Sequence, residues 1–356
     1  MNFKTIKMKL QYYLNTESTE PLTERIIDLI RNAKTYIKTG NFFFREPKIK
    51  EELINACRRG VVLFIISNLR DGGERLPAGN KFAKEEYDPH LPNLYDLVEE
   101  GAHVRCIAEL HAKFLLIDGN YGMIMSSNYT VNSLHGNPEC GVDLSECDTK
   151  YLERVFDAIF THADIKLVSR NKDGYRFKHN TNPISQEIFE NNNTNIVMTL
   201  AAIKDEAGQT IETNFKMCAI TELYDKIADI INDAEKFVFL AAFSFRELKK
   251  IPIIREAIIN AEKRKVSVNI FFNNEQKTSF DEIKELREEA PKINAAGINN
   301  NHAKFLITDN YGFIFTANID GKAGLLSGFE LGVKLDDLQY SQAKEGIKIL
   351  FSTNIN

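Results

Sequence analysis

An internal repeat constrains the fold of this chain more than any other feature of its sequence. The segment His-Ala-Lys-Phe-Leu-Leu-Ile-Asp at positions 111–118 recurs as His-Ala-Lys-Phe-Leu-Ile-Thr-Asp at positions 302–309. Each copy is an apolar run typical of a β-strand, and side chains alternate between the two faces of a strand. The His and the Lys of each copy are two residues apart, so we expect them to share a face. These pairs are His111 with Lys113 and His302 with Lys304.

The repeat continues beyond these eight residues. In both halves a turn and a second apolar strand lead to a hydroxyl residue followed by Asn, and a further loop leads to Glu-x-Gly-Val. The matching residues are Ser126, Asn128 and Glu139 in the first half, and Thr316, Asn318 and Glu330 in the second. Two imidazoles and two ammonium groups brought together suit chemistry on a phosphodiester. One His attacks, the other protonates the leaving oxygen, and the lysines hold the negative charge.

The duplicated pattern resembles the phospholipase D superfamily, whose motif is His-x-Lys-x4-Asp followed by Gly-Ser-x-Asn. The resemblance covers both halves of the chain. Met125 and Phe315 stand where the family usually has Gly, and Thr316 replaces the Ser. The resemblance implies two lobes packed through a pseudo-twofold axis, with one site at their interface. It also implies phosphoryl transfer in two steps, without a metal, through a phosphohistidine.

The resemblance gives each motif residue an expected role. His111 is the nucleophile, because the N-terminal His has that role in much of the family, and His302 is the general acid and base. The non-bridging oxygens are held by Lys113, Lys304, Asn128 and Asn318, with Ser126 and Thr316 as further substrate-binding residues. Glu139 and Glu330 are expected to fix the tautomers of the histidines; the alternative is that they are surface acids.

Two further residue pairs and one long loop have expected roles outside the His/Lys motif. Asp118 and Asp309 precede tight turns, where Asp commonly makes local hydrogen bonds, so we expect a structural role. Arg45 and Arg246 occupy the same repeat position at a strand end. They either grip phosphate as guanidinium groups or form salt bridges with the adjacent Glu. The long loop at 70–93 has the length of a functional loop, and one hypothesis is that it forms a wall over the site.

Strand-like and helix-like segments alternate in each half. Helical periodicity appears near 19–38, 47–59, 93–100 and 148–163, and again near 221–234, 252–264, 281–289 and 337–351. Between them lie apolar strands that suit buried positions in a sheet. We therefore expect the α/β class, with two similar sandwich lobes and mixed sheets. The expected boundaries are 1–165 for the first lobe, 166–198 for a connection and 199–356 for the second lobe. The polar connection, basic at its start, is either a solvated linker or a patch facing nucleic acid or a membrane.

Composition narrows the class of protein. With 356 residues and a net charge of −5, the chain lacks the basic excess of a protein that coats nucleic acid. No apolar run approaches the roughly 20 residues that span a bilayer, and there is no Trp to anchor an interfacial helix. We expect no stable membrane association. Five cysteines without Cys-x-x-Cys spacing predict reduced thiols and a cytoplasmic location. No metal-ligand spacing or Gly-rich phosphate loop is visible, so we expect no cofactor.

The sequence leaves three hypotheses for function. The first is a hydrolase of the nuclease type that cleaves DNA or RNA, in restriction or phage defence, with a helicase or ATPase as a partner. Asn128-Tyr129-Thr130 and Phe329-Glu330-Leu331-Gly332 favour it, because they look like segments of compact nuclease members. The second is a phospholipase D or phosphatidyltransferase acting on phospholipids. The third is a non-catalytic subunit that binds nucleic acid or a partner, which two intact motif sets disfavour.

Overall fold

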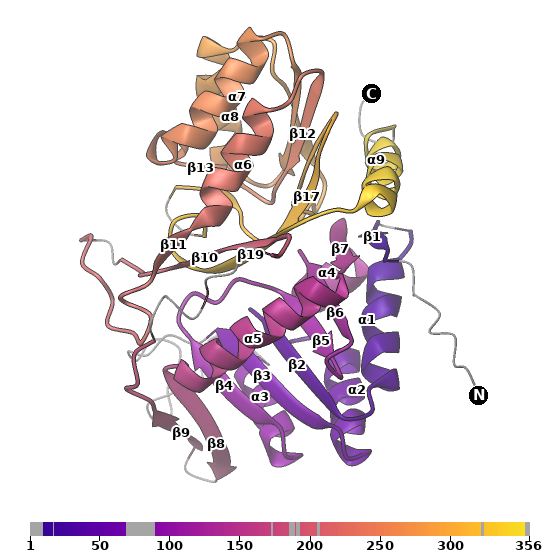
Figure 1. The fold of residues 1–356 in the computed structure, drawn as a ribbon, viewed down its shortest axis with the longest axis vertical. Helices are drawn as coiled ribbons and strands as arrows, with labels where there is room; N and C mark the ends of the chain where they lie inside the picture. The colour runs from indigo at the N-terminus through magenta and orange to yellow at the C-terminus, as the bar shows by residue number, and fades with distance from the viewer. Residues whose placement is uncertain are drawn as a thin grey trace.

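Two lobes lie one above the other along the long axis of the molecule (Figure 1). The computed structural model describes residues 10–16, 18–68, 90–171, 174–184, 189, 193–204, 207–321 and 324–352. Most of the loop at 70–93 lies outside these residues, so its predicted role as a wall is not addressed. No helix in the described part of the chain is both long and apolar enough to cross a membrane.

Lobe 1 contains the first copy of the repeat. Its elements are β1 (Tyr12–Asn15), α1 (Pro21–Asn32), β2 (Tyr36–Asn41), α2 (Pro47–Arg58), β3 (Val62–Asn68), α3 (His90–Glu99), β4 (His103–Ile107), β5 (Phe114–Ile117), β6 (Tyr121–Met125), α4 (Val131–His135), β7 (Glu139–Asp143), α5 (Glu146–His162), β8 (Ile165–Asn171) and β9 (Gly174–His179). Proline at the first turn and a buried apolar stripe explain why α1 and α2 form where the periodicity predicts them.

Lobe 2 repeats this order with shorter connections. Its elements are β10 (Ile196–Ala201), β11 (Ala219–Thr221), α6 (Glu222–Asn232), β12 (Phe237–Ala241), β13 (Phe245–Arg246), the 3-10 helix η3 (Leu248–Lys250), α7 (Pro252–Lys263), β14 (Ser267–Asn273), α8 (Lys277–Glu289), β15 (Asn294–Ile298), β16 (Phe305–Thr308), β17 (Gly312–Phe315), β18 (Ile319–Asp320), β19 (Gly328–Lys334) and α9 (Asp337–Ser352).

The two large sheets share one topology. Strand order is β1-β7-β6-β5-β2-β3-β4-β8-β9 in lobe 1 and β11-β10-β19-β17-β16-β12-β14-β15 in lobe 2. In each, three parallel strands meet an antiparallel set at the strand that carries the repeated motif: β5 pairs with β2, and β16 pairs with β12. The prediction of an α/β chain with two similar mixed-sheet lobes is confirmed.

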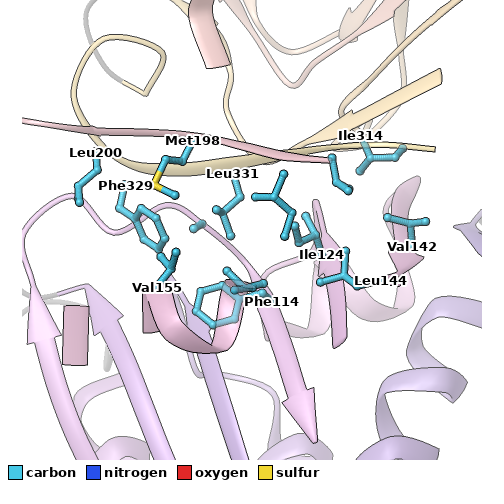
Figure 2. Close-up of a cluster of buried hydrophobic side chains, with 14 of the residues drawn as sticks. Phe114, Ile124, Val142, Leu144, Val155, Met198, Leu200, Ile314, Phe329 and Leu331 are labelled. Atoms are coloured by element: carbon cyan, nitrogen blue, oxygen red, sulfur yellow. The ribbon is translucent and has the colours of Figure 1, made fainter. Parts of the chain in front are cut away.

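Apolar layers cover both faces of each sheet. On the outer face of lobe 1, α1, α2 and α3 bury one core, and α6, α7 and α8 do the same in lobe 2. A third core lies between the lobes, where Phe114 and Val155 of lobe 1 meet Met198, Phe329 and Leu331 of lobe 2 (Figure 2). This shared core fixes one lobe against the other, and the repeated motifs lie at the same interface.

The expected connection at 166–198 differs in the structure. Its first part forms β8 and β9, which extend the sheet of lobe 1 beyond β4, and β10 already belongs to lobe 2. The segment is mostly polar, so its strand periodicity is weak in the sequence. In β8, Ile165 and Leu167 are buried, and Lys166 and Val168 between and after them are exposed. The segment is therefore not a free linker from residue 166.

Asp118 is structural, as predicted. It has φ 53°, and its carboxylate accepts hydrogen bonds from the backbone N–H groups of Lys34, Thr35 and Tyr36 at 2.8–2.9 Å. Asp309 accepts the equivalent bonds from Glu235, Lys236 and Phe237. Each Asp therefore ties the turn after the motif strand to the start of the neighbouring parallel strand.

We expect Asp118→Ala to lower the free energy of unfolding by about 2 kcal/mol, because several backbone donors lose their acceptor. Burial raises the pKa of Asp118, but the hydroxyl and backbone donors outweigh it and hold the pKa below 3.8. The contribution is therefore present above that pH and is lost as the pH falls through the folded-state pKa. Urea unfolding at pH 7 and pH 3 measures it. Equal stability of variant and wild type at pH 7 would contradict this role.

Candidate active site

The backbone of each repeated motif is fastened to the opposite lobe. His111 and Ala112 donate their N–H groups to the carbonyl of Phe329 on β19, at 3.0 and 2.8 Å. His302 donates its N–H to the carbonyl of Pro138, next to β7, at 3.1 Å. The His and Lys of each copy directly precede β5 or β16. Both motifs therefore enter the same interface from opposite sides.

The glutamates cross between the lobes. His111 Nδ1 lies 2.7 Å from Oε1 of Glu330, and His302 Nδ1 lies 2.7 Å from Oε1 of Glu139. Each imidazole is thus oriented by the carboxylate of the other lobe. Nδ1 of His111 is hydrogen-bonded to Glu330, and with Nδ1 as the N–H donor the Nε2 atom of His111 carries the lone pair of the neutral ring. Neither histidine has a complete environment within its own lobe.

The hydroxyl residues hold the glutamates. Ser126 donates its hydroxyl to Oε2 of Glu139, and Thr316 donates to Oε2 of Glu330. Both hydroxyls are fully buried, and each also accepts a backbone N–H, that of Cys140 or of Leu331. The structure therefore places Ser126 and Thr316 in a position to orient the glutamates. Their role in substrate binding stays a prediction.

The two lysines are fully buried beside the histidines. Lys113 Nζ donates to the carbonyl of His111, and Lys304 Nζ donates to that of His302 at 2.9 Å. Lys304 Nζ also lies 3.3 Å from both ring nitrogens of His302. Burial lowers the pKa of both lysines, opposed by the charges of the glutamates. The ammonium groups therefore lack solvation, which a bound anion would replace.

Burial also lowers the pKa values of the two histidines. It lowers the pKa of His111 to about 4, because loss of hydration outweighs the attraction of Glu330 and the nearby Lys113 acts in the same direction. The pKa of His302 is lowered for the same reason, against the attraction of Glu139. The lysine of the opposite lobe contributes to each shift. The histidines and lysines therefore share one electrostatic environment.

The glutamates stay ionised in this environment. Burial raises the pKa of both Glu139 and Glu330, but the histidine and lysine charges and the hydroxyl donors outweigh it, so each pKa lies below 4.5. Two carboxylates then balance two ammonium groups around neutral imidazoles. A bound phosphodiester adds one negative charge, which favours protonation of one imidazole.

The asparagines lie in the same region of the repeat. Asn128 is buried and Asn318 is partly exposed, and the amide oxygen of each has no hydrogen-bond partner among the described residues. An amide oxygen with unused hydrogen-bonding capacity is suited to a polar ligand. Their role on the non-bridging oxygens stays a prediction.

The two residues that replace the Gly of the family motif point their side chains away from the site. Met125 and Phe315 directly precede the hydroxyl residues, so along the strand they face the opposite side. Both are fully buried in the outer cores, Met125 in that of lobe 1 and Phe315 in that of lobe 2. Their side chains therefore fill the sheet-to-helix layer and leave the His/Lys/Glu cluster unchanged.

The two arginines differ from each other. The guanidinium of Arg45 stacks over the ring of Phe43, with Cζ 3.7 Å from the centroid. Arg246 forms an ion pair with Asp320 at 2.5 Å, not with the adjacent Glu247. The assignment of both guanidinium groups to phosphate stays a prediction. For Arg246, the salt bridge is formed with an acid far along the sequence, which the repeat alone does not indicate.

Two aromatic residues beside the histidines were missed. Phe42 packs edge to face with His111, and Phe243 packs in the same way with His302, at centroid distances of 5.4 and 5.3 Å. The repeat itself carried the signal. Phe42 lies three residues before Arg45, and Phe243 lies three residues before Arg246.

Comparisons with known proteins agree with this geometry. The sequence matches the family described as "Cardiolipin synthase, PLD-like domain" over residues 26–160 and 227–347. The 5'-3' exonuclease PLD3 of Xenopus laevis is 23% identical over 89% of this chain and 71% of its own length. The fold is similar to that of a phosphatidylserine synthase from Haemophilus influenzae Rd KW20, with a TM-score of 0.60 and 13% identity over 96% of this chain and 85% of the other.

A polyphosphate kinase from Porphyromonas gingivalis has a TM-score of 0.57 and 11% identity over 96% of this chain. The chain spans 50% of the length of that kinase. Both solved structures show the fold alone. The family match covers both motif-bearing halves, each with its own His, Lys and Glu. The chain therefore belongs to the PLD-like domain family, within the phospholipase D superfamily of phosphodiesterases.

Proposed function

We propose that the protein is a nuclease that cleaves DNA or RNA through a phosphohistidine and without a metal ion. The observation that carries the proposal is the crossed arrangement at the lobe interface. Two partly exposed histidines, each beside a glutamate of the other lobe, share one environment with two buried lysines. This arrangement supplies a nucleophile, an acid and positive charge together.

The first chemical step breaks the bond to the leaving group. Nε2 of His111 attacks phosphorus, and the bond from phosphorus to the leaving oxygen breaks as His302 donates its proton to that oxygen. Glu330 stabilises the positive charge that develops on His111. The two lysines stabilise the charge on the non-bridging oxygens.

The second step regenerates the enzyme. His302, now neutral, accepts a proton from water as the water oxygen attacks phosphorus, and the bond between phosphorus and Nε2 of His111 breaks. Glu139 stabilises the imidazolium that forms on His302. An alcohol in place of water would give transfer instead of hydrolysis, so the same residues serve both outcomes.

Two considerations support a nucleic acid as the substrate. A sequence relative that is 23% identical over 89% of this chain is described as an exonuclease, and aromatic rings suited to bases pack against the histidines. The runner-up is a phosphatidyl-transfer reaction. It is favoured by the family description and by the fold of the phosphatidylserine synthase. A cytoplasmic role in phage defence beside a helicase or ATPase remains part of the proposal.

We expect activity to survive chelation. Within the described residues, no group of three or more His, Cys, Asp and Glu side chains could hold a metal ion. The lysines take the role that a metal has elsewhere. Labelled single- and double-stranded DNA, RNA and phospholipid vesicles, each tested with EDTA, measure this. Loss of turnover in EDTA with rescue by a divalent ion would contradict the chemistry, and turnover of vesicles alone would favour the runner-up.

The pH dependence should reflect the lowered histidine pKa values. His111 must be neutral, and its pKa of about 4 keeps it so down to acidic pH. His302 must be protonated, and its pKa is also lowered, so kcat/KM should fall as the pH rises through that value. We expect a bell with its maximum below pH 6.5, whose limbs report the coupled pair. The profile of kcat should lie at higher pH, because bound phosphate favours protonation. An optimum of kcat/KM above pH 8 would contradict this assignment.

A further inference from the structure

Aromatic rings flank both histidines at equivalent positions of the repeat. Phe42 follows β2 and packs against His111, and Phe243 follows β12 and packs against His302. Both phenylalanines are partly exposed, whereas the two motif lysines beside the histidines are fully buried. Each ring therefore contacts a motif histidine and is also accessible to solvent.

The burial of the charged groups limits how a phosphate reaches them. The side chain of His111 is 22% exposed and that of His302 is 12% exposed. Only a small part of each imidazole is therefore accessible to a phosphate. In a duplex the bases beside each phosphate are stacked and paired, so they cannot turn toward rings beside the histidines. Bases of a single strand can be splayed out and stacked on aromatic side chains.

The aromatic surface is larger on the side of lobe 1. Phe43 packs against Phe42 at 4.3 Å between centroids, and the guanidinium of Arg45 stacks on Phe43. The equivalent of Phe43 in lobe 2 is Ser244, which is fully buried. The side of His111 therefore presents two rings and a stacked cation, and the side of His302 presents one ring.

We propose that Phe42, Phe43 and Phe243 bind the bases on either side of the scissile phosphate and so select single-stranded nucleic acid. Phe42 and Phe43 form the stronger base site, next to the nucleophile, and Phe243 forms the weaker one. This inference rests on the proposed nuclease function. It adds the form of the substrate and the residues that determine it.

The test uses the full chain and short labelled DNA and RNA strands, single and duplex. Phe42→Leu, Phe43→Leu and Phe243→Leu keep apolar volume but remove the aromatic face. Tyr121→Leu is the matched control, because Tyr121 is an exposed aromatic residue at the end of β6 opposite to Ser126. A second set of strands carries one abasic nucleotide on either side of a single cleavable phosphate, with the other linkages made resistant.

We expect wild-type enzyme to cleave single strands at least tenfold faster than duplexes. The Phe42 and Phe43 variants should raise KM for single strands about tenfold or more, within the range of base stacking on an aromatic ring. The Tyr121 variant should match the wild type. An abasic nucleotide should cost more on one side of the phosphate than on the other, and Phe42→Leu should remove that difference.

Two results would overturn the inference while leaving the nuclease proposal intact. These are equal cleavage of abasic and intact strands, and unchanged KM in all three phenylalanine variants of an active nuclease. Failure of the wild type to cleave any strand, with hydrolysis of phospholipid vesicles instead, would reject the nuclease proposal itself. Circular dichroism shows whether a variant has lost its fold. Phe42→Tyr keeps the aromatic face and should have the KM of the wild type, which distinguishes loss of base stacking from loss of folding.

Discussion

Replacing either histidine with alanine should abolish turnover, but the two variants should fail at different steps. His111→Ala removes the nucleophile, so it should lose at least about 10³-fold in rate on every substrate. His302→Ala should lose as much on a strand with an alkoxide leaving group. On a p-nitrophenyl ester, whose leaving group needs little protonation, it should still phosphorylate His111 and release one equivalent of nitrophenol before stalling.

The control is His103→Ala, because His103 is an exposed residue at the start of β4 and stacks only on Phe64 among the described contacts. It should keep wild-type activity. A nitrophenol burst in His111→Ala and none in His302→Ala would reverse the two roles. Equal residual activity of both variants on the p-nitrophenyl ester would contradict a division of labour between them.

Substitution of the glutamates should cause the second-largest loss of activity. Glu330→Gln should impair the step that depends on His111, and Glu139→Gln the steps that depend on His302. Each glutamate lies in the lobe opposite to the histidine that it affects. We expect losses of about 10²–10⁴-fold, the range seen when an orienting carboxylate becomes an amide.

The pH profile separates the two glutamates. Each carboxylate raises the pKa of its histidine, so its removal should lower that pKa further. Glu330→Gln should move the acid limb of kcat/KM to lower pH, and Glu139→Gln should move the alkaline limb to lower pH. Glu100→Gln, which only breaks the exposed ion pair with Arg58, is the control. Full activity with unshifted limbs in both site variants would show that the glutamates do not orient the histidines.

Most of the fold could be predicted from the sequence because the periodic signals were strong. The helices α2 and α7 begin at the prolines that mark them, and the apolar runs at β3 and β14 form central strands. The hairpin β8–β9 was missed, because polar edge strands carry few buried positions and resemble a linker in composition. Edge strands need only one buried face, which Ile165 and Leu167 supply.

The candidate residues, and glutamates as partners of the histidines, could be predicted from the repeat, but which glutamate meets which histidine could not. Duplication of the motif identified His111 and His302 with their lysines, since no structural requirement repeats such a set twice. Nothing in either copy shows that Glu139 crosses to the other lobe, because pairing across an interface depends on how two lobes pack. Ser126 and Thr316, by contrast, each contact the glutamate of their own lobe. They share a strand face with Asn, yet the buried glutamate is the nearer acceptor.

The most direct test of the central claim is to identify the covalent intermediate by rapid quench. Wild-type enzyme is mixed with a labelled single strand for milliseconds, quenched in alkali and digested, and the peptides are analysed by mass spectrometry. The phosphoramidate bond of a phosphohistidine is stable in alkali, so the alkaline quench preserves the intermediate. We predict one adduct, on His111, in the wild type. In His302→Ala it should form with the p-nitrophenyl ester, and in His111→Ala with neither substrate. An adduct on His302 would reverse the roles. Cleavage without any adduct, and with inversion at a chiral phosphorothioate, would contradict the two-step mechanism.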